Sequence, residues 1–189
     1  MTGVRRTRRG VVVIFDEVEA SLLRHLVGEV RELLVDGSQD LPEPAAPGSG
    51  LPTDAELVAL TGMGEPADAE TPGDPALARL LPDAYRDDPG AAGEFRRLTE
   101  SALRRDKVSA ADRLLATLPG KGPGEVRLDP ELTETWLSTI NDVRLALGTR
   151  LEVREEMAEP DPEDPDAPAY VVYLWLTELQ GVLIEVADG

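Results

Sequence analysis

The strongest constraint on this chain is the stretch Gly37–Pro75, in which proline, glycine and acidic residues dominate. Its 39 residues hold six glycines and seven prolines, and no lysine or arginine occurs between Arg31 and Arg79. A segment of this composition cannot bury enough apolar surface to offset the entropy that it loses on ordering. We therefore expect a flexible acidic segment over residues 37–73. The capping-box spacing of Thr53 and Glu56 leaves open a short ordered island within it.

A second flexible acidic segment is expected over residues 152–168. Between Leu151 and Pro168 the chain has eight acidic residues and one arginine. The whole chain of 189 residues has the length of one ordinary domain. The sequence therefore predicts a single, mostly helical domain over residues 1–189 that two acidic segments interrupt.

Three helix starts are marked by an aspartate that can act as an N-cap. Asp16 precedes an apolar stripe over Val18–Val35. Asp74 and Asp129 are each followed by proline, which favours the first turn of a helix. These starts predict helices over residues 18–35, 75–81 and 131–147, with Gly148 ending the last one.

Three further helices are predicted from the spacing of apolar residues. Two short ones cover Glu94–Arg105 and Ser109–Leu118, with Ser109 as the N-cap of the second. The third covers Tyr170–Val186 and is apolar on well over half of its circumference, which predicts a central, mostly buried helix. A strand over Tyr170–Trp175 is the alternative, because these residues have high β-propensity.

Two short runs predict strands. Val11–Phe15 is an unbroken apolar run, and Val126–Leu128 is a shorter one that follows a turn rich in glycine and proline. If the two strands pair, they join both ends of the core. The predicted fold class is therefore mainly α: a helical domain with a small two- or three-stranded β element.

Residues that carry catalysis or bind metals are scarce. The chain has no cysteine and one histidine, which excludes disulfides, thiolate nucleophiles and thiolate metal sites. No pair among its 37 acidic residues stands out as catalytic. We therefore expect no enzyme activity, no catalytic residues, and no cofactor or metal.

The net charge of −18 favours solubility and protein partners, and it argues against direct binding to nucleic acid. The longest apolar run, Tyr170–Leu176, has seven residues, whereas a membrane span needs about 20. The arginine pairs Arg5–Arg6 and Arg8–Arg9 precede an apolar run that is too short for an export signal. These features predict a cytoplasmic protein with no membrane contact.

One region reverses the acidity of the chain. Glu94–Arg113 has six basic and four acidic residues. This composition leaves open a salt-bridged surface, a face that docks a protein partner, and a helix-turn-helix that binds DNA. The residues predicted for docking are Arg96, Arg97, Arg104, Arg105 and Lys107.

Two stretches together resemble a known family. One runs from Asp74 to Tyr85 and continues through Phe95-Arg96-Arg97 to Lys107, and the other runs from Trp136 to Leu151. With the opening strand and Trp175-Leu176, they resemble an actinobacterial family of unknown function that includes an oxidative-stress regulator.

The resemblance implies a cytoplasmic regulatory protein that acts on transcription through a protein partner, an alternative sigma factor of RNA polymerase. In that regulator two cysteines with the spacing Cys-x-x-x-Cys sense the oxidant, and this chain has no cysteine. Either this member does not sense oxidants itself, or sensing is not general in the family. A non-catalytic adaptor in proteolysis or metabolism is the alternative function.

Several polar residues of the two stretches are explained neither by helix ends nor by the core. We expect them to form one network that locks two helices together. The predicted members are Arg79, Asp83, Tyr85, Asn141, Asp142, Arg144, Thr149 and Arg150.

Overall fold

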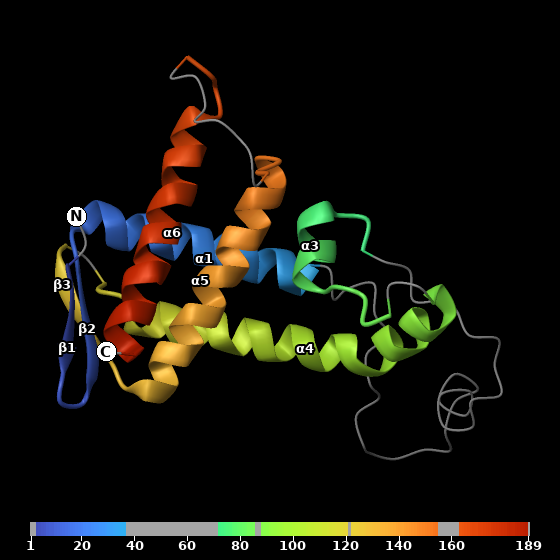
Figure 1. Cartoon of the computed structure of the whole chain (residues 1–189), viewed down its shortest axis with the longest axis horizontal. Helices are drawn as coiled ribbons and strands as arrows, with labels where there is room; N and C mark the ends of the chain where they lie inside the picture. The colour runs from blue at the N-terminus through green and yellow to red at the C-terminus, as the bar shows by residue number, and fades with distance from the viewer. Residues whose placement is uncertain (1–2, 37–71, 86–87, 121, 155–162, 189) are drawn as a thin grey trace.

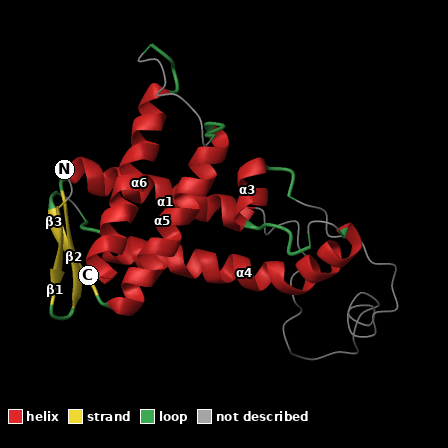
Figure 2. Ribbon diagram, viewed as in Figure 1, coloured by secondary structure: helices red, strands yellow, loops and turns green. Residues whose placement is uncertain are grey.

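The computed structural model describes residues 3–36, 72–85, 88–120, 122–154 and 163–188. Five helices and a three-stranded sheet lie in these ranges (Figures 1 and 2), which confirms the predicted fold class. The elements are β1 (Gly3–Thr7), β2 (Gly10–Phe15), α1 (Glu17–Asp36), α3 (Pro75–Leu80), α4 (Pro89–Thr117), β3 (Gly124–Leu128), α5 (Pro130–Arg150) and α6 (Ala167–Asp188). Most of the predicted flexible segment 37–73, with the island at Thr53, and residues 155–162 of the second segment lie outside the described residues.

The sheet joins the two N-terminal strands to residues 124–128 in the second half of the chain. Its strand order is β1-β2-β3 and both pairs are antiparallel. Val13 of β2 lies opposite Val4 on one side and Val126 on the other. The two strands predicted from sequence are therefore confirmed, and they pair directly. The position of β1 was not predicted, because Arg5 and Arg6 interrupt its apolar pattern.

The three predicted aspartate caps are confirmed. Asp16 and Glu19 form a reciprocal capping box at the start of α1, with N···O distances of 2.8 and 3.1 Å. The Oδ1 atom of Asp74 accepts hydrogen bonds from two backbone amides of α3, at 2.8 and 3.1 Å. The Oδ1 atom of Asp129 accepts one from the amide of Leu132 in α5, at 2.9 Å. These starts follow from local chemistry alone.

The prediction of two short helices over Glu94–Arg105 and Ser109–Leu118 is wrong. One continuous helix, α4, covers both and begins earlier, at Pro89, with Asp88 as its N-cap. Ser109 lies in the interior of this helix. No glycine or proline separates the two predicted helices, and α4 packs against both α1 and α5. The cap preference of one serine is a weak signal beside that packing.

The prediction that Gly148 ends the fifth helix is also wrong. Helix α5 continues to Arg150 and closes with a hydrogen bond of 2.9 Å from the amide of Val153 to the carbonyl of Gly148. Gly148 lies where α6 comes close. A Cβ atom at this position would be 3.1 Å from the ring of Tyr173. The missing side chain therefore permits the approach of α6.

The last predicted helix, Tyr170–Val186, is confirmed as α6, and the strand alternative is wrong. Its predicted central, mostly buried position is wrong as well. One face places Leu176, Leu179 and Leu183 in the core, whereas Val171 is 64% exposed. Helix α6 covers one side of the core instead of passing through it (Figure 1).

The apolar core lies between the sheet, α1, α3, α5, α6 and the C-terminal half of α4. At its centre Trp136 is fully buried, with its ring 5.8 Å from that of Phe15. The indole nitrogen of Trp136 donates a hydrogen bond of 3.2 Å to the hydroxyl of Thr117. The sheet lies at one end of the long axis of the molecule and the N-terminal half of α4 extends to the other (Figure 1).

Candidate functional site

The most unusual feature of the described structure is a row of three buried charges on α4, which we call the ladder: Arg96, Glu100 and Arg104. Steps of four residues place all three side chains on one face of the helix. Their side chains are 5%, 8% and 5% exposed. Charged side chains are rarely buried to this degree unless they are paired.

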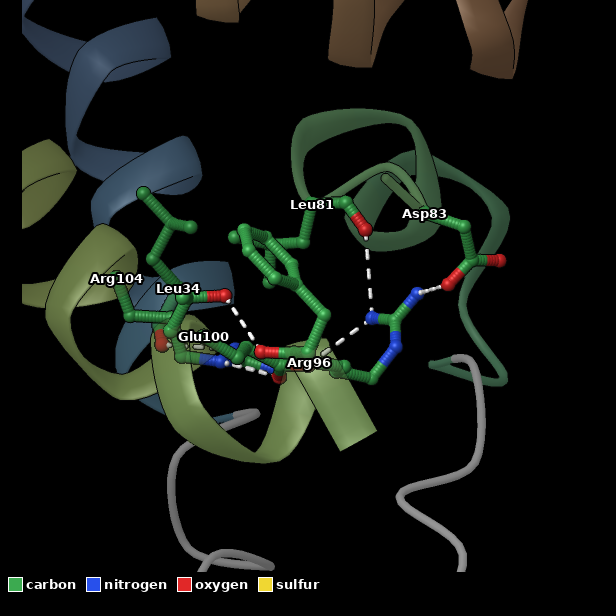
Figure 3. A network of polar contacts seen from close by, with 8 residues as sticks. Leu34, Leu81, Asp83, Arg96, Glu100 and Arg104 are labelled. Carbon is green, nitrogen blue, oxygen red and sulfur yellow. Dashed lines mark hydrogen bonds and ion pairs between the residues drawn. The ribbon is translucent and has the colours of Figure 1, made fainter. Parts of the chain in front are cut away.

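Glu100 lies at the centre of the ladder and binds one arginine with each carboxylate oxygen (Figure 3). Its Oε2 atom accepts a hydrogen bond from Nη1 of Arg96 at 2.9 Å. Its Oε1 atom accepts bonds from Nε and Nη2 of Arg104, at 2.8 and 2.6 Å. Such charge-assisted bonds are the strong class of hydrogen bond in proteins.

The outer sides of both arginines bind the ends of other helices (Figure 3). Arg104 donates from Nη1 to the carbonyl of Leu34 in the last turn of α1, at 3.2 Å. Arg96 donates to the carbonyl of Leu81, the C-cap of α3, at 3.3 Å, and also to the carboxylate of Asp83. The last turn of α1 has no basic residue of its own. Arg104 therefore supplies from α4 the cation that a helix C-terminus favours.

The charges of this cluster balance, because two guanidinium groups face the carboxylates of Glu100 and Asp83. Burial alone would lower the pKa of Arg96, but the hydrogen bonds that it donates to Asp83 and Glu100 outweigh burial and raise that pKa. Arg96 therefore stays charged, and the ladder holds a balanced set of charges. Its chemistry is that of a clamp that fixes α1 and α3 on α4.

No group of three or more His, Cys, Asp or Glu side chains in the described part of the chain is arranged to hold a metal ion. This observation does not test the expectation that the chain has no catalytic, cofactor or metal site. It remains a prediction from the sequence.

The residues predicted to form one polar network are distributed over separate contacts. Asp83 binds Arg96 of the ladder, and Tyr85 packs edge-to-face on Phe95 with ring centroids 5.9 Å apart. Arg79 is exposed, and neither it nor Asn141 has a side-chain hydrogen bond or ion pair within the described residues. The contacts are separate because the α5 members point in different directions around that helix.

The three α5 residues with polar partners bind three different helices. The carboxylate of Asp142 accepts a bond of 2.7 Å from Lys107 of α4. Arg144 donates to Thr177 of α6 at 3.0 Å and lies over the ring of Tyr173. Arg150 binds Asp74, the N-cap of α3, at 2.6 Å, and Thr149 bonds only to a carbonyl of its own helix.

Two of these carboxylates have shifted pKa values of opposite sign. Burial raises the pKa of Asp142, and the ammonium group of Lys107 opposes that shift without cancelling it. For Asp74, burial alone would raise the pKa, but backbone hydrogen bonds from α3 and the guanidinium of Arg150 lower it overall. The ionised form of Asp74 therefore stabilises the fold, whereas ionisation of Asp142 costs energy.

The residues predicted for docking fall into three groups. Arg96 and Arg104 are buried in the ladder, so they do not form part of a surface. Lys107 is held by Asp142 at 2.7 Å and is 20% exposed. Of the five residues predicted for docking, only Arg97 and Arg105 are exposed. The sequence could not separate these groups, because a buried ion ladder and a solvated helix face use the same residue types.

The structure also reveals an exposed apolar stripe on α4 that the sequence analysis missed. Phe95, Leu98, Ala102 and Arg105 follow one another at steps of three or four residues, and we call them the α4 outer face. Phe95 is 43% exposed and Leu98 is 69% exposed. The helical spacing of Phe95 and Leu98 was the available signal, but it looks the same whether the stripe faces a core or solvent.

Within the described residues, α6 is the one helix whose length and composition would allow it to cross a membrane, over Ala167–Ala187. Helices that cover the core of a soluble protein pass the same test. Leu176, Leu179 and Leu183 of α6 pack in the core of this fold.

Comparisons with known proteins identify the family. The model of the domain of unknown function DUF2017 matches residues 1–187. Proteins named oxidative stress regulator AosR, from Mycobacterium tuberculosis (strain H37Rv) and Mycobacterium bovis, are 38% identical over 185 residues, which cover 90% of this chain and 79% of theirs. A relative from Mycobacterium leprae is 36% identical over 180 residues, covering 88% of this chain and 77% of its own. No solved structure matches the chain. The chain therefore belongs to the DUF2017 family, as its two motif stretches predicted.

Proposed function

We propose that this chain is a non-catalytic regulator of transcription that acts in the cytoplasm by binding a protein partner, a sigma factor or RNA polymerase itself. The name of its mycobacterial relatives, oxidative stress regulator, supports a regulatory role. The family resemblance of the two motif stretches suggests the class of partner. The α4 outer face is the structural observation that carries the proposal.

The α4 outer face has the composition of a protein-binding surface. Two large apolar side chains, Phe95 and Leu98, are exposed side by side, and Tyr85 extends the patch with an exposure of 51%. Exposed aromatic residues beside arginine are enriched in protein interfaces. Arg105 on the stripe and Arg97 next to it would attract an acidic rim on the partner. This surface replaces the docking face predicted from Arg96 and Arg104.

The ladder supports this surface from the other side of α4. Phe95 and Leu98 flank Arg96 in the sequence, and the side chain of Arg96 is held by Glu100 and Asp83. A docking face on a helix that is fixed in this way needs little reordering when the partner binds.

Regulation by a thiol switch is excluded for this chain, because it has no cysteine. Its three methionines are scattered along the sequence. We therefore expect partner binding to be the same with and without peroxide.

A pull-down from nuclease-treated native lysate, read by mass spectrometry with and without peroxide, tests the proposal. We expect a sigma factor or RNA polymerase to be enriched in both conditions. The double variant Phe95→Ser/Leu98→Ser should lose that enrichment. Val171→Ser/Leu174→Ser on α6 is the matched control, because these side chains are 64% and 45% exposed.

Two results would contradict the proposal. If a protease subunit or a metabolic enzyme is enriched instead, the chain is an adaptor of another pathway. If both double variants keep the sigma factor or polymerase equally well, the partner does not bind the α4 outer face.

A further inference from the structure

The arginines that the sequence analysis assigned to no function come together at the sheet. Arg5 and Arg6 lie on β1, and Arg8 and Arg9 form the turn that joins β1 to β2. Arg127 of β3 joins them, because Arg5 and Arg127 both lie opposite Val12 and share one face of the sheet. Arg6 lies opposite Val11 and is therefore on the other face of β1. On the face of Arg5 and Arg127, the carboxylate of Glu125 is the partner of both arginines. In a chain with a net charge of −18, these arginines are a local reversal of sign.

These arginines are poorly paired. Glu125 lies 3.5 Å from Arg5 and 3.8 Å from Arg127, which are long contacts. Arg6, Arg8 and Arg9 are exposed and have no side-chain hydrogen bond or ion pair in the part of the chain that the structure describes.

Several cations of the helical part are paired more closely. The guanidinium groups there approach carboxylate oxygens to between 2.5 and 2.9 Å in the pairs Arg31–Asp112, Arg113–Glu131, Arg150–Asp74 and Arg96–Glu100. The hairpin therefore holds several exposed positive charges that the described fold does not use.

The turn that carries Arg8 and Arg9 is held in one conformation. Gly10 has a φ of +132°, and a Cβ atom there would lie 2.0 Å from the carbonyl oxygen of Leu128, so only glycine fits. The hydroxyl of Thr7 donates to the carbonyl of Gly10 at 2.9 Å and accepts from the amide of Arg9 at 3.4 Å. The arginines therefore lie on a hairpin of fixed conformation in the three-stranded sheet, at the end of the molecule opposite to the N-terminal half of α4 (Figure 1).

We propose that the β1–β2 hairpin binds the phosphate backbone of a nucleic-acid duplex. β2 is the central strand of the three-stranded sheet, so the hairpin presents its arginines from the edge strand β1 and from the exposed turn. Arginine makes bidentate contacts with phosphate. The overall acidity of the chain predicts weak association, and the proposal is confined to this hairpin. It would leave the α4 outer face free for a protein.

An acidic peptide is the less favoured ligand for the same charges. A peptide that adds to the edge of a sheet gains specificity from pockets for its alternate side chains. On the outward face of this hairpin Val12 is 2% exposed, between Arg5 and Arg127. This face presents charged arginine side chains instead.

Fluorescence anisotropy of the purified full chain with a labelled DNA duplex, measured over a series of salt concentrations, tests the proposal. If about three phosphates are contacted, the affinity should fall roughly 40-fold between about 50 and about 200 mM salt. The variant Arg6→Ala/Arg8→Ala/Arg9→Ala should bind at least about tenfold more weakly at the lower salt concentration and should show a flatter salt dependence. The corresponding triple lysine variant should keep most of the affinity, because counterion release depends on charge.

The matched control is Arg79→Ala/Arg113→Ala/Arg154→Ala, which removes the same charge from three exposed arginines elsewhere. It should change the affinity by less than about threefold, if the effect is local rather than a result of net charge. Circular dichroism and the Tm confirm that each variant is folded. Three results would overturn the proposal: no binding by the parent chain at low salt, equal losses in the hairpin and control variants, or binding of polyglutamate that depends on the same three arginines.

Discussion

The two halves of α4 bury the same helix face by different means. In the N-terminal half the buried positions are Ala92 and the ladder residues Arg96, Glu100 and Arg104. In the C-terminal half they are Ala111 and Leu114, which join the apolar core around Trp136. The difference follows from what each half meets. The first half meets the carbonyl ends of α1 and α3, which need hydrogen-bond donors, and the second meets apolar side chains.

This contrast shows how one helix serves two structural roles. Apolar burial stabilises the fold without directional demands. The ladder adds little net stability of its own, because desolvation offsets most of the attraction between its charges. Its geometry instead specifies where α1 and α3 end on α4, and so which face of α4 is left exposed for Phe95 and Leu98.

Removing the central charge of the ladder should cause the largest loss of stability in α4. Glu100→Ala leaves two buried arginines without their shared partner, and we expect a loss of about 3–5 kcal/mol in the free energy of unfolding. Urea denaturation at neutral pH measures it. Glu94→Ala on the same helix is the control, because Glu94 is exposed, and it should change stability by less than about 0.5 kcal/mol.

A second variant separates the loss of the carboxylate from the presence of unpaired charge. Arg96→Met/Glu100→Leu/Arg104→Met removes all three charges and should be more stable than Glu100→Ala. A triple variant that is no more stable than the single one would show that the bonds to Leu34 and Leu81 dominate the ladder.

Damage to the apolar core that the C-terminal half of α4 joins should lower the free energy of unfolding by a similar amount, for a different reason. Trp136→Ala removes a fully buried side chain and leaves a cavity, so we expect a loss of about 3–5 kcal/mol. The same denaturation series includes Trp175→Ala, whose side chain is only partly buried and should cost less. A loss below about 1 kcal/mol for Trp136→Ala would contradict the central position of this residue in the core.

A smaller effect is expected at Asp74, which caps α3 near the ladder. Asp74→Ala should cost about 1 kcal/mol, whereas Asp74→Asn keeps the capping bonds and should cost less. The folded state lowers the pKa of Asp74, so its ionised form stabilises the fold above the unfolded pKa, and that contribution is lost as the pH falls through the lower, folded value. Stability measured from about pH 5 downward should therefore fall less steeply for Asp74→Asn than for the parent chain. Equal slopes would show that the carboxylate of Asp74 has no such linkage.

Local signals predicted much of the fold correctly. The aspartate caps at Asp16, Asp74 and Asp129 mark helix starts, because the bonding partners lie within three residues in the sequence. The strands around Val13 and Val126 follow from β-branched runs. By contrast, Gly148 was misread as a helix end because its role is to admit Tyr173 of another helix. The continuity of α4 past Ser109 likewise depends on packing with α1 and α5.

The candidate sites were harder to predict than the fold. Arg96 and Arg97 are adjacent in sequence, yet the first is buried in the ladder and the second is exposed. Arg5 and Arg127 are far apart in the sequence and come to one face of the sheet only when β1 and β3 both pair with β2. The sequence by itself determined the helix starts, the central strands, the family and the absence of a thiol switch, because these depend on neighbouring residues or on composition. Only the tertiary structure decided which charges are buried, paired or exposed, because that depends on which carbonyls and carboxylates distant segments bring to each arginine.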